Sequence, residues 1–351
     1  MKAVMYAHVG DQGLICDKIV VDEEIKSKKK PKIVAMAGFP VPEPVERAVA
    51  KVNAKKGKTE IIPEFFPPLC EYTITIGNTE ITDKDVEMVV EGEDAFEAKK
   101  AGKVCYRLYS PDAKQARPLI LFLHGGGECG TDNHRQMYGT IGAIHLAKMY
   151  PDIYVMAPQA PEGLLKPGAP MPKMSKKTFA DSDDPNLAGW TRPVLGTVCD
   201  EIRKMIKDGK VDASRVYVTG LSMGGAGALR ALSVGADLFA AGAPICPTMT
   251  PETFRILKGL VHTKLWISTA YVDHTIYRHK YIVDGIMALR DAGNNNAHLT
   301  LYSPEELEAY GIATDPDMPL EAKFGANHAS WILTYHNEYG IMSWLTEQVK
   351  R

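Results

Sequence analysis

The stretch Arg215-Val-Tyr-Val-Thr-Gly-Leu-Ser-Met-Gly-Gly-Ala-Gly-Ala-Leu229 decides the fold and the chemistry of this chain. Its first part is apolar and β-branched, as in a buried strand, and its last part has the pattern of a helix. Between them stands Gly-x-Ser-x-Gly, in which Gly220 and Gly224 let the backbone crowd a sharp strand-to-helix turn. Such a turn lifts a serine hydroxyl above the edge of a sheet. The sequence therefore predicts Ser222 as a nucleophile.

A second apolar strand, Leu119–Leu123, ends in His124-Gly-Gly-Gly. Attack of a serine on a carbonyl carbon produces an oxyanion, which preorganised N–H donors stabilise. A glycine loop brings backbone amides close to that oxygen with no side chain in the way. We expect the oxyanion-hole donors to be the amide of Met223 and that of Gly126 or Gly127.

The same loop offers a competing interpretation, because residues 125–130 spell Gly-x-Gly-x-x-Gly, the fingerprint of dinucleotide-binding folds. That fingerprint is accompanied by an acidic residue at the end of the next strand, which binds the ribose. Here the next strand, Ile153–Ala157, is followed by Pro158-Gln159, and the nearby acid, Asp152, precedes it. The sequence therefore disfavours a nucleotide site.

A serine nucleophile needs a general base, and the base needs an acid that orients it. In chains with this turn, the order along the sequence is serine, then acid, then histidine. Asp273 lies just past the apolar stretch Leu265–Thr269 and is the predicted acid. Asp284 and Asp291 are weaker candidates, because both fall in the helical pattern that follows.

The predicted base is His328, which occupies a loop between the last strand and the final helix, predicted over Trp331–Val349. The other histidines come too early for this order, begin a strand, lie in the last helix or lie too near the acid loop. Among these, His124 is expected to pack and to form hydrogen bonds at the end of its strand. His274 and His279 stay as second choices.

The pattern along the chain changes near residue 103. Over residues 1–103, β-branched runs separated by glycine and proline predict a small β domain of the sandwich type, in which residues 46–55 fit a helix or a strand. Over residues 104–351, short apolar strands alternate with helices, which predicts a mostly parallel sheet flanked by helices. The proline-rich segment 161–190 is typical of a lid or a binding element.

Composition excludes several classes of function. The chain has 351 residues, of which 45% are hydrophobic, and its net charge of −2 gives no electrostatic reason to bind nucleic acid or a membrane. No apolar run approaches the roughly 18 residues that a membrane span needs. We interpret the lysine run between residues 26 and 32 as a solvated loop.

The cysteines and the N-terminal residues indicate the cellular compartment in which the protein works. Six scattered cysteines predict no disulfide framework, and no set of His, Cys, Asp and Glu has the spacing of metal ligands. The first residues lack the apolar stretch of a secretory signal. We therefore expect a cytoplasmic protein without a metal, or a secreted one whose signal is absent from this numbering.

Five motifs occur in order along the chain: residues 124–133, 157–161, 211–225, 239–246 and 328–331. Together they resemble α/β-hydrolase esterases related to feruloyl esterases and polyhydroxybutyrate depolymerases, a group that includes predicted peptidases. The β-rich leader resembles that of thermophilic esterases with an N-terminal immunoglobulin-like domain. The chain departs from the family at Ser268–Asp273, where a His-Gly pair is usual, and at Cys129, where arginine is usual.

The resemblance implies an α/β-hydrolase fold and a serine carboxylesterase that needs no cofactor. Ser222, His328 and Asp273 would hydrolyse short-chain or aromatic esters of acetyl or feruloyl type, in small molecules or linked to polysaccharide. The N-terminal domain could serve homo-oligomerisation. Trp190 and Trp331 are candidates for lining the substrate pocket, although tryptophan is more commonly a core residue. A serine peptidase and a non-catalytic binding protein on a hydrolase scaffold stay open as alternatives.

Overall fold

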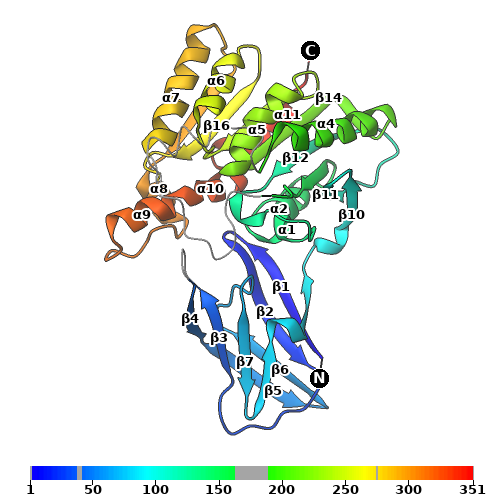
Figure 1. The fold of residues 1–351 in the computed structure, drawn as a ribbon, viewed down its shortest axis with the longest axis vertical. Coiled ribbons are helices and arrows are strands. Elements are labelled where there is room, and N and C mark those ends of the chain that lie inside the picture. The colour runs from blue at the N-terminus through cyan, green and yellow to red at the C-terminus, as the bar shows by residue number, and fades with distance from the viewer. Residues whose placement is uncertain (1, 38–41, 163–188, 274–275, 351) are drawn as a thin grey trace. The chain divides into compact units, whose positions relative to one another are not determined.

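The computed structural model describes residues 2–37, 42–162, 189–273 and 276–350. Most of the predicted lid segment, together with His274, therefore lies outside the described residues. The chain forms two compact units, one built chiefly from the residues up to Ala95 and the other chiefly from those beginning at Phe96. Figure 1 shows the strands of the first unit in blue and cyan.

The second unit is built on an eight-stranded sheet with the order β10-β11-β13-β12-β14-β15-β16-β17 (Figure 1). From β13 to β17 every neighbouring pair is parallel, whereas β10–β11 and β11–β13 are antiparallel. This is the mostly parallel sheet that the sequence predicts. Along the chain its strands are β10 (Phe96–Ala101), β11 (Val104–Tyr109), β12 (Arg117–Leu123), β13 (Tyr154–Pro158), β14 (Val211–Leu221), β15 (Ala241–Ile245), β16 (Leu265–Ala270) and β17 (Ala297–Tyr302).

The central strands are apolar along their length because they are buried on both faces. Every residue of β15 is buried, and so is every residue of β12 after Arg117. Helices supply the cover: α1 (Arg135–Tyr138), α2 (Ala143–Met149), α4 (Arg192–Lys207), α5 (Met223–Val234), α6 (Pro251–Gly259), α7 (Ile276–Asp291), α8 (Pro304–Ala309), α9 (Leu320–Asn327), α10 (Trp331–Tyr335) and α11 (Ile341–Glu347). None of the described helices is both long and apolar enough to cross a bilayer.

Helix α4 shows how the sequence forms these elements. Thr191 caps its N-terminus, accepting a hydrogen bond from the backbone N–H of Val194, and Pro193 occupies the first turn, where its missing N–H is not needed. Its apolar residues recur at helical spacing from Leu195 to Met205 and are buried. This face joins the core of the second unit, and α4 packs beside α5 (Figure 1).

The predicted final helix, Trp331–Val349, is not continuous, and in this respect the sequence-based prediction was wrong. It ends at Tyr335, and α11 begins only at Ile341. Between them Asn337, Tyr339 and Gly340 adopt the left-handed conformation with φ of 64°, 57° and 70°. A helix cannot continue through such residues.

The first unit consists of two sheets, with the orders β5-β6-β2-β1-β9 and β4-β3-β7-β8. Buried side chains of both sheets, among them Met5, Ile19, Ile33 and Ile74, form one hydrophobic core. Residues 46–55, which fit a helix or a strand, lie in strands. The strands are β1 (Ala3–Gly10), β2 (Gly13–Val21), β3 (Lys32–Ala37), β4 (Glu43–Arg47), β5 (Val49–Lys55), β6 (Lys58–Pro63), β7 (Tyr72–Ile76), β8 (Thr79–Thr82) and β9 (Val86–Val90).

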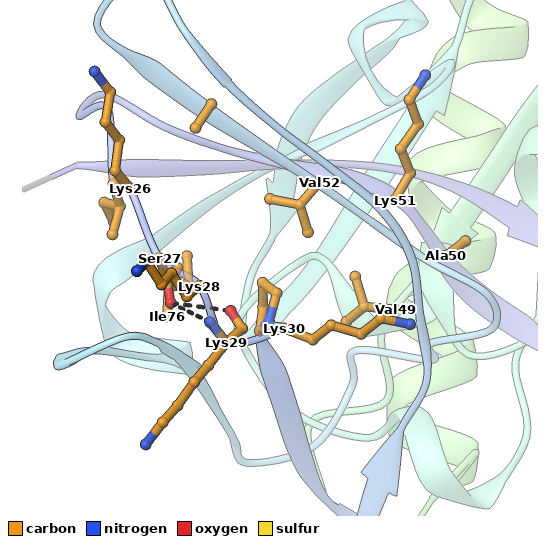
Figure 2. A pocket seen from close by; sticks show the side chains of 13 residues that line it. Lys26, Ser27, Lys28, Lys29, Lys30, Val49, Ala50, Lys51, Val52 and Ile76 are labelled. Carbon is orange, nitrogen blue, oxygen red and sulfur yellow. Dashed lines mark hydrogen bonds between the residues drawn. The ribbon is translucent and has the colours of Figure 1, made fainter.

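The lysine run borders a groove of about 600 Å³ in this unit (Figure 2). Apolar residues such as Val49, Val52 and Ile76 line its interior. In Figure 2 the side chains of Lys26 and Lys51 extend in different directions and do not converge on one point. The arrangement agrees with a solvated, charged loop rather than with an anion site.

A buried ion pair gives a test of the packing of the second unit. Arg230 on α5 donates from Nε to Glu252 Oε2 at 2.9 Å, and both side chains are less than a tenth exposed. Replacement of Arg230 by Met removes this partner and leaves Glu252 its contact with Arg192 at 3.3 Å, so the free energy of unfolding should fall by about 2 kcal/mol in urea titrations. Arg203→Met, which breaks an exposed pair with Asp237, should cost less than about 1 kcal/mol. Equal losses in the two variants would contradict the buried geometry.

Candidate active site

Ser222 stands at the junction of β14 and α5 with φ 57° and ψ −116°. An L-residue with a side chain rarely adopts this conformation, and such strain persists only where the surroundings hold it. Here the backbone N–H of Ser222 donates to Ile245 O at 3.0 Å, and its carbonyl accepts from Thr248 N–H at 3.0 Å. Both bonds come from the end of the neighbouring strand β15 and the residues after it. They fix the serine in the strained turn that the motif predicts.

Two glycines of the motif are required by close approaches of backbone. A Cβ atom on Gly224 would lie 1.9 Å from Leu123 O and 2.5 Å from His124 O. A Cβ atom on Gly220 would lie 2.5 Å from Gly224 O. Only glycine therefore lets the first turn of α5 pass this close to the end of β12.

His328 lies between the serine and the acid. Its Nε2 is 2.9 Å from Ser222 Oγ, and its Nδ1 is 2.9 Å from Asp273 Oδ2. Because a carboxylate only accepts hydrogen bonds, Nδ1–H donates to Asp273, which leaves Nε2 to accept from the serine hydroxyl. The side chain of Asp273 is completely buried and that of His328 is 18% exposed. The structure thus brings together three residues that lie far apart in the sequence. The predicted loop position of His328 was wrong, because His328 begins a 3-10 turn, His328–Ser330, directly after α9.

Asp273 follows β16, at the carboxyl end of the sheet. The side-chain amide of Asn327 donates to the carbonyl of Val272 at 3.1 Å and so ties the acid loop to the segment that carries His328. The competing acids are placed elsewhere: Asp284 and Asp291 belong to α7, and Asp284 pairs with Lys280 on the same helix.

The glycine loop follows β12 and forms a single 3-10 turn, Gly126–Glu128. Strands β12 and β14 are parallel neighbours, with Leu123 opposite Gly220, so the loop and Met223 at the start of α5 lie at the same edge of the sheet. His124 is buried beneath them. Its Nε2 accepts from the backbone N–H of Ala160 at 2.9 Å and its Nδ1 donates to Gly125 O at 2.7 Å, as expected of a structural histidine.

Cys129, one of the two places where the sequence differs from the esterases that it resembles, directly follows this turn. Burial and the charge of Glu128 raise the pKa of its thiol to about 12. The thiol is therefore protonated at neutral pH, and the protonated form is not nucleophilic.

The two tryptophans occupy different positions. Trp190 is fully buried, its ring packs against His124, and its indole N–H donates to His124 O at 3.0 Å. It is a core residue that supports the glycine loop, so its assignment to the substrate pocket was wrong. Trp331 is partly exposed and stands edge-on to His328, with ring centres 5.4 Å apart.

Sequence reasoning missed the supporting roles of Asn327 and Gln159. Gln159 is fully buried and donates to Glu128 O, the last carbonyl of the turn, at 3.0 Å. A polar residue directly after a buried strand, at the carboxyl edge of the sheet, was the available signal. Among the described residues, no group of three or more His, Cys, Asp or Glu side chains is placed to hold a metal ion.

Comparison with known proteins places the fold. No protein-family profile and no curated protein matches the chain. A crystal structure of a thermostable esterase is 23% identical, with 99% of this chain and all of that chain covered and a TM-score of 0.66. An acylaminoacyl peptidase (14% identity, 98% and 56% covered, TM-score 0.48) and an esterase from Thermogutta terrifontis (16%, 60% and 81%, 0.41) are also similar. The first of these likenesses, with the parallel sheet and the serine turn, shows an α/β-hydrolase fold.

The close approach at Gly224 gives a prediction. In Gly224→Ala the new methyl group meets backbone oxygens that cannot move away, so the free energy of unfolding should fall by about 3 kcal/mol. Gly196→Ala is the matched control, because Gly196 lies within α4 and a Cβ there meets no atom within 4 Å. Alanine should stabilise that helix by about 0.5 kcal/mol. Chemical denaturation compares the two variants, and a tolerated Gly224→Ala would refute the packing described.

Proposed function

We propose that this protein is a serine carboxylesterase acting on short-chain or aromatic esters, such as acetyl or feruloyl esters. The observation that carries the proposal is the pair of 2.9 Å contacts through which His328 joins Ser222 to Asp273. A strained serine beside a glycine loop, with its hydroxyl on an imidazole and that imidazole on a buried carboxylate, is the arrangement that acyl transfer requires.

The proposed reaction has two steps. In the first, Ser222 Oγ attacks the ester carbonyl carbon while His328 Nε2 accepts the hydroxyl proton, and Asp273 stabilises the imidazolium. The resulting oxyanion is held by the backbone N–H of Met223 and that of Gly126 or Gly127. His328 then gives the proton to the departing alcohol. In the second step, water activated by His328 attacks the acyl-enzyme and releases the carboxylic acid.

Two finer assignments belong to the proposal. We propose that Trp331, partly exposed beside His328, contacts the acyl or alcohol group of the substrate. We also propose that the first unit is an accessory, immunoglobulin-like sandwich through which copies of the chain associate; its main part ends at Ala95, before the boundary near residue 103 that the sequence predicts, because β10 (Phe96–Ala101) pairs with β11 in the sheet of the second unit. Light scattering of the full chain tests the association, since a monomer at high concentration would exclude it.

Replacement of Ser222 tests the proposal directly. Ser222→Ala should lower kcat for p-nitrophenyl acetate at least about 10⁴-fold, because it removes the nucleophile and leaves the fold intact. A fluorophosphonate should add one group to the wild type, as seen by mass spectrometry, and none to the variant. Ser233→Ala, on the exposed side of α5, is the control. It should keep the wild-type kcat and should still react with one fluorophosphonate. Absence of labelling in the wild type would favour a binding role, and labelling at another residue would contradict the assignment of Ser222 as the nucleophile.

The pH dependence tests the base. A free histidine loses its proton near pH 6.5, and only the neutral imidazole accepts the serine proton. The value of kcat/KM should therefore fall about tenfold for each pH unit below that range. A profile that stays flat down to about pH 4 would argue against His328 as the base. A panel of acetyl, butyryl, feruloyl and peptide-amide substrates then separates an esterase from a peptidase.

A further inference from the structure

The glycine loop after β12, which includes the 3-10 turn Gly126–Glu128, is held at both ends by buried side chains. Glycines fix no conformation by themselves, so a loop made of them needs partners that do. At its start, the indole N–H of Trp190 donates to His124 O at 3.0 Å. At its end, the side-chain amide of Gln159 donates to Glu128 O at 3.0 Å. The three glycines lie between these two anchors.

Gln159 forms hydrogen bonds through both the nitrogen and the oxygen of its side-chain amide. Besides donating to Glu128 O, it accepts the backbone N–H of Asn133 through Oε1 at 2.7 Å. Its own backbone is fixed as well, since its N–H donates to Cys105 O at 2.8 Å, and the residue is fully buried. A carboxylate cannot donate to the carbonyl, and an aliphatic side chain can do neither.

The surroundings of this amide leave it little freedom. Asp132 Oδ2 accepts a further hydrogen bond from Gln159 Nε2 at 3.3 Å. Burial opposes ionisation of Asp132, but the backbone N–H groups of Arg135 and His134, with the Gln159 amide, lower its pKa below the ordinary value. A carboxylate is therefore present beside the amide at neutral pH. Gly130 beside it has φ 154°, a conformation that favours glycine, and a Cβ there would lie 3.1 Å from Gln159 Nε2.

We propose that Gln159 is a positioning residue that keeps the backbone N–H donors of the oxyanion hole in place. By holding Glu128 O, it fixes the 3-10 turn Gly126–Glu128 and thereby the direction of the Gly126 and Gly127 amides. This inference rests on the proposed function, because an oxyanion hole matters only if Ser222 forms a tetrahedral adduct. Donors must stand at 2.7–3.1 Å from the oxyanion, so a small displacement of the turn costs rate without weakening substrate binding.

Gln159→Glu tests the inference, because it keeps the shape of the side chain, removes the donor and places a second carboxylate beside Asp132. The matched control is Asn294→Asp. Asn294 is also buried, donates to Leu260 O and Thr263 O, and accepts the N–H of Asn296, but it lies just before β17, at the opposite edge of the sheet. Both variants should lose stability, and both are assayed well below their melting temperatures.

For Gln159→Glu, kcat/KM with p-nitrophenyl acetate should fall about 10- to 100-fold, less than the loss for a deleted oxyanion donor. The inhibition constant of an alkyl trifluoromethyl ketone, which forms an oxyanion on the serine, should rise by the same factor. The matching methyl ketone, bound without an adduct, should bind within about twofold of the wild type. In Asn294→Asp, kcat/KM and the inhibition constants of both ketones should equal those of the wild type. Equal kinetic losses in the two variants would overturn a positioning role.

Hydrogen exchange gives a readout that does not depend on activity. Peptides covering residues 124–133 should exchange faster in Gln159→Glu and at the wild-type rate in Asn294→Asp. Unchanged exchange in Gln159→Glu overturns the inference even if the enzyme is an esterase. Conversely, a wild-type chain that neither hydrolyses esters nor reacts with a fluorophosphonate overturns the proposed function, while the exchange experiment still decides whether Gln159 anchors the loop.

Discussion

The arrangement of the second unit depends on one close approach, the passage of Gly224 against the carbonyl oxygens of Leu123 and His124. This approach requires β12 and β14 to be parallel neighbours, with a sharp turn directly after β14. The turn forces Ser222 into its strained conformation, and the same contact places the glycine loop next to the serine. Strain at Ser222 and the position of the loop are therefore two results of one packing constraint.

Much of the second unit and of its site could be predicted from the sequence, because the signals are local. The strands are continuous apolar runs, and the serine turn has a fixed spacing of glycines. Asp273 and His328 could be chosen since each follows an expected strand at the edge where such loops gather. The order of these residues along the chain does not show that their side chains are in contact. The two 2.9 Å distances, from His328 to Ser222 and from His328 to Asp273, do.

Other features depend on contacts that a linear pattern does not contain. Trp190 was misplaced because an apolar residue near a site can face the substrate or the core, and only its bond to His124 O decides between them. Gln159 was missed because its role consists of two bonds to backbone atoms of a distant loop. In the first unit, β1 pairs in parallel with β9, a long-range register that no local run of residues indicates.

The contacts of His328 span long stretches of the chain, 106 residues to Ser222 and 55 to Asp273. Neither partner of His328 comes from its own neighbourhood in the sequence, so the three side chains meet only when the ends of β14 and β16 and the segment after α9 are all in their native places. These two contacts therefore report on the packing of the whole second unit. A chain that kept its helices and strands but lost this packing would separate the three side chains.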